Sequence, residues 1–352
     1  MIERRSLLAG LAGTAAAAAI APTALAQAAK KRVAIASPTV ATELMLEGMG
    51  GDPGWFAFFA ELKAQGFDSN TVTFERYSGA QFNYQRRLQG TRWNGVGVAI
   101  ANAKPDVVFA TSSYIARGVS LTADTIPVVF MVGDAKGAGL VEELDKPGGN
   151  LTGVSAIGGP AWEATRMELL REAVPAAAKV AYLIKSQTIS PTAAGQALLA
   201  SARAGAQKAG ATLEPAYIDD LLDDAGLDGT AHLRAILEAA KKGAQGLVVA
   251  ETLDTTEYAA MMGGVALTQK LPGIAPWRDF VIGGGLMSYG PNMTEMYKSG
   301  AQILARVLKG EKPGNIPVVR PQADLVISQR NARHLGVTLP QSIVSKAKEM
   351  LT

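Results

Sequence analysis

Three hydroxyl side chains, Thr111, Ser112 and Ser113, directly follow a continuous apolar run at residues 107–110 and precede a segment with helical periodicity. This position predicts that the hydroxyls lie at the carboxyl end of a buried strand and at the N-terminus of the next helix. Hydroxyl groups, together with the unpaired N–H groups and the positive dipole end of a helix, form a site for a carboxylate. The alternative is simple N-capping, which accounts for at least one of the three hydroxyls.

Carboxylates follow two other apolar runs. Asp134 comes after the run at residues 128–132, and Glu251, with Thr252 beside it, comes after the run at residues 247–250. A carboxylate at such a strand end could neutralise the ammonium group of a ligand, or it could instead cap the next helix. We expect Asp134 to be the main partner of the ammonium group and Glu251 the second.

Five further residues complete the predicted binding site. Ser37 and Thr39 end the first apolar run of the chain, with the same capping alternative. Trp277 and Tyr289 could stack on an aromatic or apolar part of a ligand, although buried aromatic rings more often belong to a core. Ser288 lies next to Tyr289 in a short, glycine-flanked segment that we expect to be a strand.

Sequence motifs for catalysis and metal binding are missing. The segment GVSAI at residues 153–157 lacks the second glycine of a nucleophile elbow, and the glycines at residues 283–285 lack the lysine of a phosphate loop. The two histidines, His232 and His334, lie in polar helical contexts, where we expect surface or capping roles, and the chain has no cysteine. We therefore expect no metal, no cofactor and no catalytic nucleophile.

Short apolar runs alternate with amphipathic helical segments along most of the chain. The strands that we expect cover residues 33–36, 72–77, 107–110, 128–132, 180–184, 213–218 and 247–250, and a last element covers residues 274–282. Wholly apolar strands separated by helices predict parallel sheets covered on both faces. A turn-rich segment at residues 144–153 divides the pattern, so the sequence predicts two doubly wound α/β lobes.

The best-specified helix of the chain follows Asn292. This residue and Glu295 form an N-cap with a capping-box partner, apolar residues recur at three- and four-residue steps, and Gly310 ends the helix. Because the strand and helix here repeat the pattern at the start of the chain, we expect a return to the first lobe. The predicted boundaries are residues 31–153 for lobe 1, 154–285 for lobe 2, 286–322 for the return to lobe 1, and 323–352 for a C-terminal segment on lobe 2.

The first 26 residues have the features of an export signal. Arg4 and Arg5 form a twin-arginine pair, an apolar stretch follows, and Ala24 and Ala26 give a small-x-small cleavage site. The alternative is an N-terminal membrane anchor, for which the apolar stretch is short. Because no cysteine is present to carry a lipid, we expect a soluble periplasmic protein after cleavage. The net charge of +3 is small and not clustered, so it gives no indication of nucleic-acid binding.

Six segments together carry a family resemblance. They are PDVVFATSS at residues 105–113, IPVVFMVGD at 126–134, KPGGNLTGVS at 146–155, RMELLREAVP at 166–175, GGLMSYGPNMTEMYKSGAQILARVLKGEKPGNIPV at 284–318 and LVISQRNARHLGVTLPQSI at 325–343. Taken in order, they resemble the substrate-binding proteins of ABC transporters, in the family that includes tryptophan- and aromatic-amino-acid-binding members. The resemblance covers nearly all of the chain after about residue 31.

The resemblance implies a type I periplasmic binding protein fold, with a three-crossover hinge near residues 153, 285 and 322. It also implies that the loop at residues 111–113 and Asp134 contribute to a ligand cleft between the lobes. The chain departs from the family where Ala135 and Lys136 replace a common proline, and where a longer first loop occupies residues 42–54.

We therefore expect a monomeric binding protein that captures a small amino-acid-like or other carboxylated solute and delivers it to an ABC permease. One alternative is a periplasmic module that passes ligand binding to a membrane receptor. A hydrolase is a weaker alternative, because no nucleophile–base pair is visible.

Overall fold

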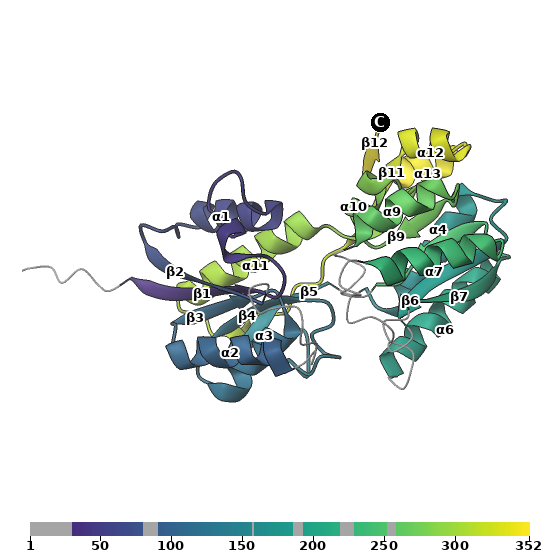
Figure 1. Ribbon diagram of the computed structural model, residues 1–352. Coiled ribbons are helices and arrows are strands. Elements are labelled where there is room, and N and C mark those ends of the chain that lie inside the picture. Colours follow the sequence, from purple (N-terminus) through teal and green to yellow (C-terminus); the bar gives the residue numbers. More distant parts are fainter. Residues whose placement is uncertain (1–29, 80–90, 157, 186–192, 219–228, 252–257) are drawn as a thin grey trace, which may run out of the picture. The chain divides into compact units, whose positions relative to one another are not determined.

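The computed structural model describes residues 30–79, 91–156, 158–185, 193–218, 229–251 and 258–352. The predicted export signal, with Arg4 and Arg5, and the candidate residue Thr252 lie outside these ranges. Two sheets, each covered by helices, organise the described chain from Lys31 onward, as Figure 1 shows.

The first sheet has the strand order β2-β1-β3-β4-β5 within the described residues, and all its pairings are parallel. Its strands are β1 (Lys31–Ser37), β2 (Val72–Ser78), β3 (Val107–Ala110), β4 (Val128–Val132) and β5 (Leu151–Ser155). Its helices are α1 (Pro53–Ala64), α2 (Thr91–Ala103), α3 (Ser113–Thr122) and α11 (Met293–Leu308), with short 3-10 turns at Thr42–Leu44 and Pro313–Asn315.

Successive residues of the central strands serve opposite faces of the first sheet. In β1, Val33 and Ile35 pack in the cluster with α1 and α11, whereas Ala34 and Ala36 pack in the cluster with α2 and α3. Figure 1 shows the two helix layers on the two sides of the sheet. Because both faces are covered, the strands must be apolar at every position, which explains the continuous runs in the sequence.

The second sheet has the strand order β12-β11-β10-β9-β8-β6-β7 within the described residues. Its strands are β6 (Lys179–Lys185), β7 (Thr212–Ile218), β8 (Gly246–Val249), β9 (Gly273–Ala275), β10 (Met287–Pro291), β11 (Ala323–Ser328) and β12 (Glu349–Leu351). Its helices are α4 (Pro160–Ala173), α6 (Ala193–Lys208), α7 (Thr230–Lys241), α9 (Ala259–Thr268), α10 (Arg278–Gly283), α12 (Gln329–Leu335) and α13 (Gln341–Lys346). One apolar cluster joins the sheet to α4, α6, α12 and α13, and another joins it to α7, α9 and α10.

The helix predicted after Asn292 is confirmed as α11. The Asn292 side chain accepts a hydrogen bond from the Glu295 N–H at 3.2 Å, and the helix ends two residues before Gly310. Its apolar face, including Ala301 and Leu304, packs against the first sheet with α1. The chain therefore returns to the first lobe in this helix.

The strand that precedes α11 is not part of this return, so the predicted boundary at residue 286 is wrong. β10 pairs in parallel with β9 and antiparallel with β11, both in the second sheet. A strand followed by a helix has the same local pattern in either lobe, and only the hydrogen-bonded partners distinguish the two. The second crossover therefore follows Pro291 rather than Gly285.

Two other elements differ from the sequence prediction. Residues predicted as the end of a turn segment form β5, which pairs with β4, so the first crossover follows Ser155. The single element predicted at residues 274–282 is a three-residue strand, β9, followed by the helix α10. Pro276 separates the two because proline supplies no N–H for the sheet ladder.

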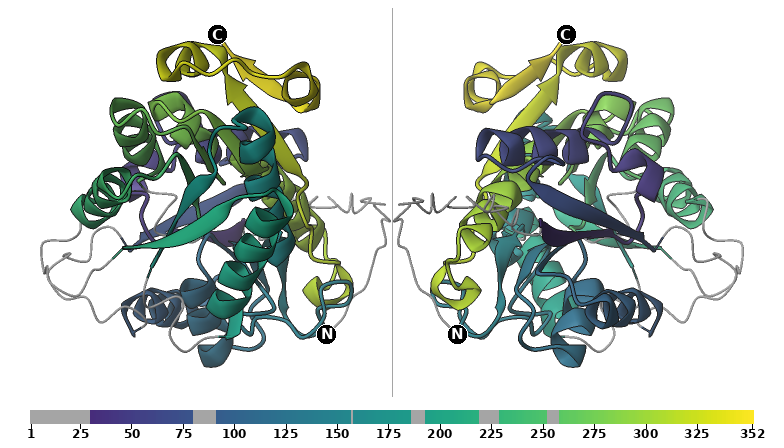
Figure 2. Two further views of the ribbon diagram at one scale, coloured as in Figure 1. Left: turned by 90° about the vertical axis from the view of Figure 1, so that its right-hand side faces the viewer. Right: turned by 90° about the vertical axis from the view of Figure 1, so that its left-hand side faces the viewer.

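The third crossover leads into the C-terminal segment. Val319 still bridges Val154 of β5, and the chain then enters β11, which joins the second sheet. Figure 2 shows this segment in yellow next to the C-terminus. Within the described residues, no helix has the combined length and hydrophobicity needed to cross a bilayer.

Two glycines in helix interiors test the packing of α11 on the sheet. A Cβ added at Gly300 would lie 2.6 Å from the ring of Phe109, which is stacked on Phe58 at 4.4 Å, whereas a Cβ at Gly95 of α2 meets nothing within 4 Å. Gly300→Ala should therefore lower the free energy of unfolding by about 1–3 kcal/mol, the usual cost of overpacking.

Gly95→Ala is the matched control, because it gains the same helix propensity without the clash. It should raise the free energy of unfolding by up to about 1 kcal/mol. Urea titration of the three proteins measures both changes, and equal stabilisation by the two variants would contradict the packing of α11 described above.

Candidate functional site

The carboxyl edge of the first sheet brings together the predicted hydroxyl residues. Ser37 ends β1 beside Ser78 of β2, and the Thr111 N–H donates to the Ala36 carbonyl at 2.9 Å, so Thr111 follows β3 next to Ser37. The strand order reverses here, because β2 lies on one side of β1 and β3 to β5 lie on the other. Ligands of open α/β sheets bind at such switch points.

Several of these hydroxyls already serve the backbone. The buried Ser37 Oγ accepts from the N–H groups of Thr39 and Val40 at 3.3 and 3.0 Å. Ser112 is the N-cap of α3 and accepts from the Ile115 N–H at 3.5 Å. Capping therefore explains Ser37 and Ser112.

The other hydroxyls at this edge are more accessible. Thr39 is exposed, while Thr111 and Ser113 are half-buried. The Thr111 hydroxyl donates a long hydrogen bond of 3.4 Å to the Ala36 carbonyl. Ser113 is the first residue of α3, so its hydroxyl lies beside the N–H groups that begin the helix.

Asp134 follows β4 and is exposed. Its Oδ1 accepts from the Gly137 N–H at 2.8 Å and closes a turn. An exposed carboxylate in such a turn keeps water as a partner, so a ligand cation gains little there. Asp134 thus closes a turn, and it caps no helix, because the element that follows it in the described chain is the strand β5.

Glu251 follows β8 and has very different surroundings. It is 3% exposed, and its Oε2 lies 2.5 Å from Nη2 of Arg166 in α4. The sequence analysis predicted that Glu251 would meet a ligand cation, but it did not foresee this arginine. The counter-charge comes from a helix 85 positions away in sequence.

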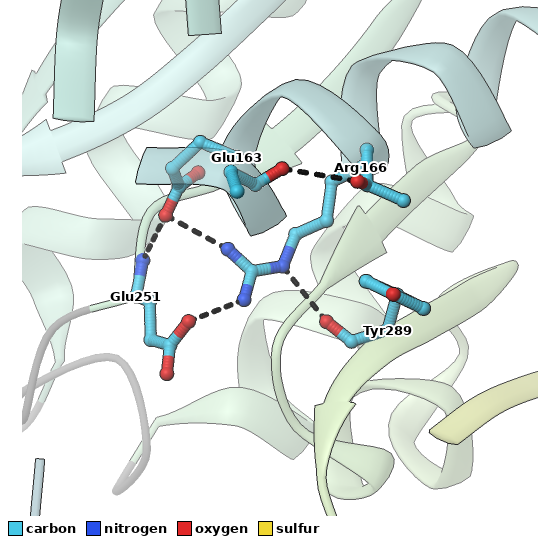
Figure 3. Close-up of polar contacts among 6 residues, drawn as sticks. Glu163, Arg166, Glu251 and Tyr289 are labelled. Atoms are coloured by element: carbon cyan, nitrogen blue, oxygen red, sulfur yellow. Dashed lines mark hydrogen bonds and ion pairs between the residues drawn. The ribbon is translucent and has the colours of Figure 1, made fainter. Parts of the chain in front are cut away.

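Arg166 is fully buried and joins three elements, as Figure 3 shows. Its Nη1 lies 2.8 Å from Oε1 of Glu163, and its Nε donates to the Tyr289 carbonyl of β10 at 2.8 Å. Glu163 Oε1 also accepts from the backbone N–H of Glu251 at 3.1 Å. We call Glu163, Arg166 and Glu251 the buried ion cluster.

A signal for this cluster is present in the sequence. Glu163 and Arg166 stand at i and i+3, and Met167 and Leu170 continue the same helix face into the core. Two charges that lie on an apolar stripe indicate a buried pair, whereas a solvent-exposed pair would lie on the opposite face.

The buried ion cluster carries a net charge of −1 when all three groups are ionised. Glu251 Oε1 is buried and has no hydrogen-bond partner within the described residues. Burial raises the pKa of Glu251, although the charge of Arg166 lowers it in part. Burial lowers the pKa of Arg166, but the charges of Glu163 and Glu251 outweigh it and raise that pKa, so the guanidinium stays charged.

The two predicted stacking residues occupy different settings. Trp277 is 8% exposed and packs with Leu271 and Phe280 in an apolar cluster, as its core alternative required. Tyr289 is half-buried, and its ring lies edge-on to that of Trp162, with centroids 6.1 Å apart. Trp162 belongs to the first turn of α4, and the sequence analysis did not single it out.

Two other side chains of the second lobe are buried. Ser288, in β10, is 2% exposed. His232 is also buried, with its ring centroid 4.8 Å from that of Tyr258, so the predicted surface or capping role is wrong for this histidine. The apolar face of α7 turns this position towards the core.

In the described part of the chain, no three His, Asp or Glu side chains are grouped to hold a metal ion.

The second sheet therefore has its own group of polar and aromatic residues. Glu251, Trp277 and Tyr289 follow or belong to the adjacent strands β8, β9 and β10, while Arg166 and Trp162 come from α4. Each sheet presents polar groups where its parallel strands end, with hydroxyls on the first and a buried charge on the second.

Removing Arg166 tests the energetics of the buried ion cluster. Arg166→Met leaves two buried carboxylates without a counter-charge and should lower the free energy of unfolding by about 3–5 kcal/mol at neutral pH. Without the arginine, the burial that raises the pKa of Glu251 is no longer opposed by a positive charge, and a carboxyl group with a raised pKa gives stability that is lost as pH rises. The defect should therefore be smaller at pH 5 than at pH 8.

Arg278→Met is the control, because it breaks a half-exposed pair with Glu349. It should cost no more than about 1 kcal/mol. Denaturant titrations at both pH values measure these effects, and a pH-independent defect in Arg166→Met would argue against two uncompensated carboxylates.

Comparison with known proteins agrees with this architecture. The solved structures include a conserved domain protein from Vibrio cholerae O1 biovar eltor, with 23% identity, a TM-score of 0.72, and coverage of 91% of this chain and 99% of that chain. An ABC domain from Streptococcus pneumonia in complex with L-Trp has 20% identity and a TM-score of 0.74, with coverage of 92% and 100%. The ligand-free, open substrate binding protein CD0873 from Clostridium difficile has 19% identity and a TM-score of 0.64, with coverage of 92% and 99%.

These identities show the shared fold alone, and no curated protein sequence matches the chain. The family is shown separately, because residues 61–351 match the model of the family described as ABC transporter substrate binding protein. The chain therefore belongs to the ABC transporter substrate binding protein family, and its two α/β lobes have the type I periplasmic binding protein fold.

Proposed function

We propose that this protein captures an amino acid or a closely related carboxylated solute between its two lobes in the periplasm and delivers it to an ABC permease. Family membership supports the general role of binding a small molecule for transport. The finer proposal on the solute comes from the chemistry at the carboxyl edges of the two sheets.

The observation that carries this proposal is the buried Oε1 oxygen of Glu251, which has no hydrogen-bond partner in the described part of the chain. A buried carboxylate oxygen without a partner is costly, and a ligand that supplies an N–H donor with a positive charge removes that cost. An ammonium group supplies both. We therefore assign the ammonium group first to Glu251 and only second to Asp134, which is exposed and already closes a turn.

The carboxylate of the solute is assigned to the edge of the first sheet. Thr111 and Ser113 offer hydroxyl donors there, and the N-terminus of α3 adds backbone N–H groups and a positive dipole end. A zwitterion therefore finds a match for its negative end on one lobe and for its positive end on the other.

The aromatic pair of Trp162 and Tyr289 supports a solute with an apolar or aromatic side chain. Tyr289 gives its backbone carbonyl to Arg166, while its ring contacts Trp162. Tyr289 is thus connected to the proposed ammonium site through Arg166, which also contacts Glu251. The bound L-Trp of the Streptococcus pneumonia structure shows that this fold accommodates such a solute in another protein.

The test of this proposal begins with the solute carried through native purification, identified by mass spectrometry. Titration calorimetry then compares the wild type with Glu251→Gln and Asp134→Asn, using that compound and its deaminated analogue. Glu251→Gln should weaken binding of the zwitterion by about 2–5 kcal/mol, the range for breaking a buried charge pair. Asp134→Asn should cost no more than about 1 kcal/mol, as expected of an exposed charge.

The deaminated analogue is the internal control, because it has no ammonium group to lose. Its affinity should change little in Glu251→Gln. If both variants bind the zwitterion as tightly as the wild type, neither carboxylate meets the ammonium group, and a neutral or purely anionic solute becomes the better proposal.

The proposed location rests on the export signal. Replacing Arg4 and Arg5 by lysine should leave the precursor in the cytoplasm, because the twin-arginine pair is the recognition element of that export route. Cell fractionation with immunoblotting measures the distribution. Undiminished export of the variant would favour the general secretory route instead.

A further inference from the structure

The buried ion cluster has an unbalanced charge. Two carboxylates share one guanidinium, and all three side chains are 0–2% exposed. Arg166 donates to Glu163 Oε1, Glu251 Oε2 and the Tyr289 carbonyl. Figure 3 shows that the other carboxylate oxygen of Glu251 is directed away from the guanidinium. Within the described residues, one buried oxygen of each carboxylate, Glu163 Oε2 and Glu251 Oε1, has no hydrogen-bond partner. Glu251 differs from Glu163 in that it follows the strand β8, at the carboxyl edge of the sheet.

We propose that Glu251 is a cation subsite that holds a proton while it is empty and releases that proton to solvent when the ammonium group of the solute docks. This proposal rests on the amino-acid ligand of the proposed function and adds proton exchange to it. The balance is one neutral carboxyl plus one ammonium group, giving one carboxylate–ammonium pair plus one proton in solution.

The physical reason is the cost of a buried net charge. An uncompensated carboxylate in a low-dielectric site takes up a proton rather than remain ionised. The protonated carboxyl keeps the Arg166 contact through one oxygen and removes the excess charge. The ammonium group supplies the same compensation, so the proton and the ligand compete for one carboxylate.

The groups that face Glu251 favour this exchange. Glu163 and Arg166 act from α4, with Glu163 repelling and Arg166 attracting the negative charge. Tyr182 of β6 is buried, and burial and the charge of Glu163 raise the pKa of its phenol, so it stays neutral. The β10 backbone contributes the Tyr289 carbonyl to Arg166, and Lys185 ends β6 at the same edge of the sheet. Burial outweighs Arg166 and raises the pKa of Glu251 itself.

The negative charge of Glu163 gives the buried ion cluster its net charge, so a substitution at this position tests the proposal directly. Glu163→Gln removes one negative charge but keeps an amide oxygen that accepts from Arg166 and from the Glu251 N–H. The cluster would then be neutral with Glu251 ionised. Glu251 should lose most of its tendency to hold a proton, and the site should lose its preference for a cation.

The first experiment measures the proton in ligand-free protein. Carbon-13 NMR of labelled glutamate side chains follows each carboxyl through a pH titration, and Glu251→Gln identifies the Glu251 signal. We expect a midpoint above the value of about 4.3 typical of exposed glutamates. In Glu163→Gln the midpoint should move down towards that value, and in Glu238→Gln, an exposed control on α7, it should not move.

The second experiment counts protons on binding. Calorimetry in phosphate and in Bis-Tris, which both buffer in the mildly acidic range and differ in ionisation enthalpy, is run with the twenty proteinogenic L-amino acids and the deaminated acid of each that binds. Below the Glu251 midpoint, binding of an amino acid should release close to one proton from Glu251. The affinity for the amino acid should therefore rise roughly tenfold for each unit by which the pH is increased. Deaminated acids should release none, and Glu251→Gln should abolish the release.

The outcomes separate this proposal from the proposed function. A Glu251 midpoint like that of exposed glutamates overturns proton storage, and amino-acid binding without proton release overturns the exchange while leaving the proposed function in place. Failure of all twenty amino acids to bind overturns the exchange together with the amino-acid assignment of the proposed function. A raised midpoint, proton release in the wild type and its loss in Glu163→Gln together support the proposal.

Discussion

The contact between the Arg166 guanidinium and its three acceptors ties together the carboxyl edge of the second sheet. It joins α4, the end of β8 and the backbone of β10 through side chains that solvent does not reach. Burying these charges is costly, because desolvation of an ion pair offsets most of its Coulomb attraction. The value of such a cluster is therefore in fixing geometry more than in adding stability.

That geometry matters because β10 leads directly into the second crossover. Tyr289 lies two residues before Pro291, after which the chain returns to the first lobe in α11. Position 290 also needs glycine, since a Cβ there would lie 2.2 Å from the Pro276 carbonyl oxygen. The strand that begins this crossover is thus held by Arg166 at Tyr289 and by the close backbone contact of Gly290 with the segment after β9.

The sequence predicts the regular part of this fold well, and physical reasons explain the rest. Short continuous apolar runs such as residues 128–132, repeated between helical segments, indicate strands buried on both faces, and the cap at Asn292 is a local feature. Lobe assignment of β10 depends on hydrogen bonds to β9 and β11, which no local pattern records. The same limit applies to the site. Hydroxyls after strands could be located from the sequence, but the pairing of Glu251 with Arg166 depends on a contact between distant segments.

The two sheet edges are chemically unequal, and this inequality bears on how a binding protein of this fold recognises its solute. The first edge offers neutral hydroxyls and helix N–H groups, while the second offers a carboxylate whose partner is incomplete. Neither edge alone satisfies both ends of a zwitterion, so under the proposed function such a solute would bind best when both lobes reach it at once. A ligand shifts a conformational equilibrium only by its difference in affinity between the states. The division of charge between the lobes is what would give a zwitterion that difference, and a solute with only one of the two groups would shift the equilibrium less.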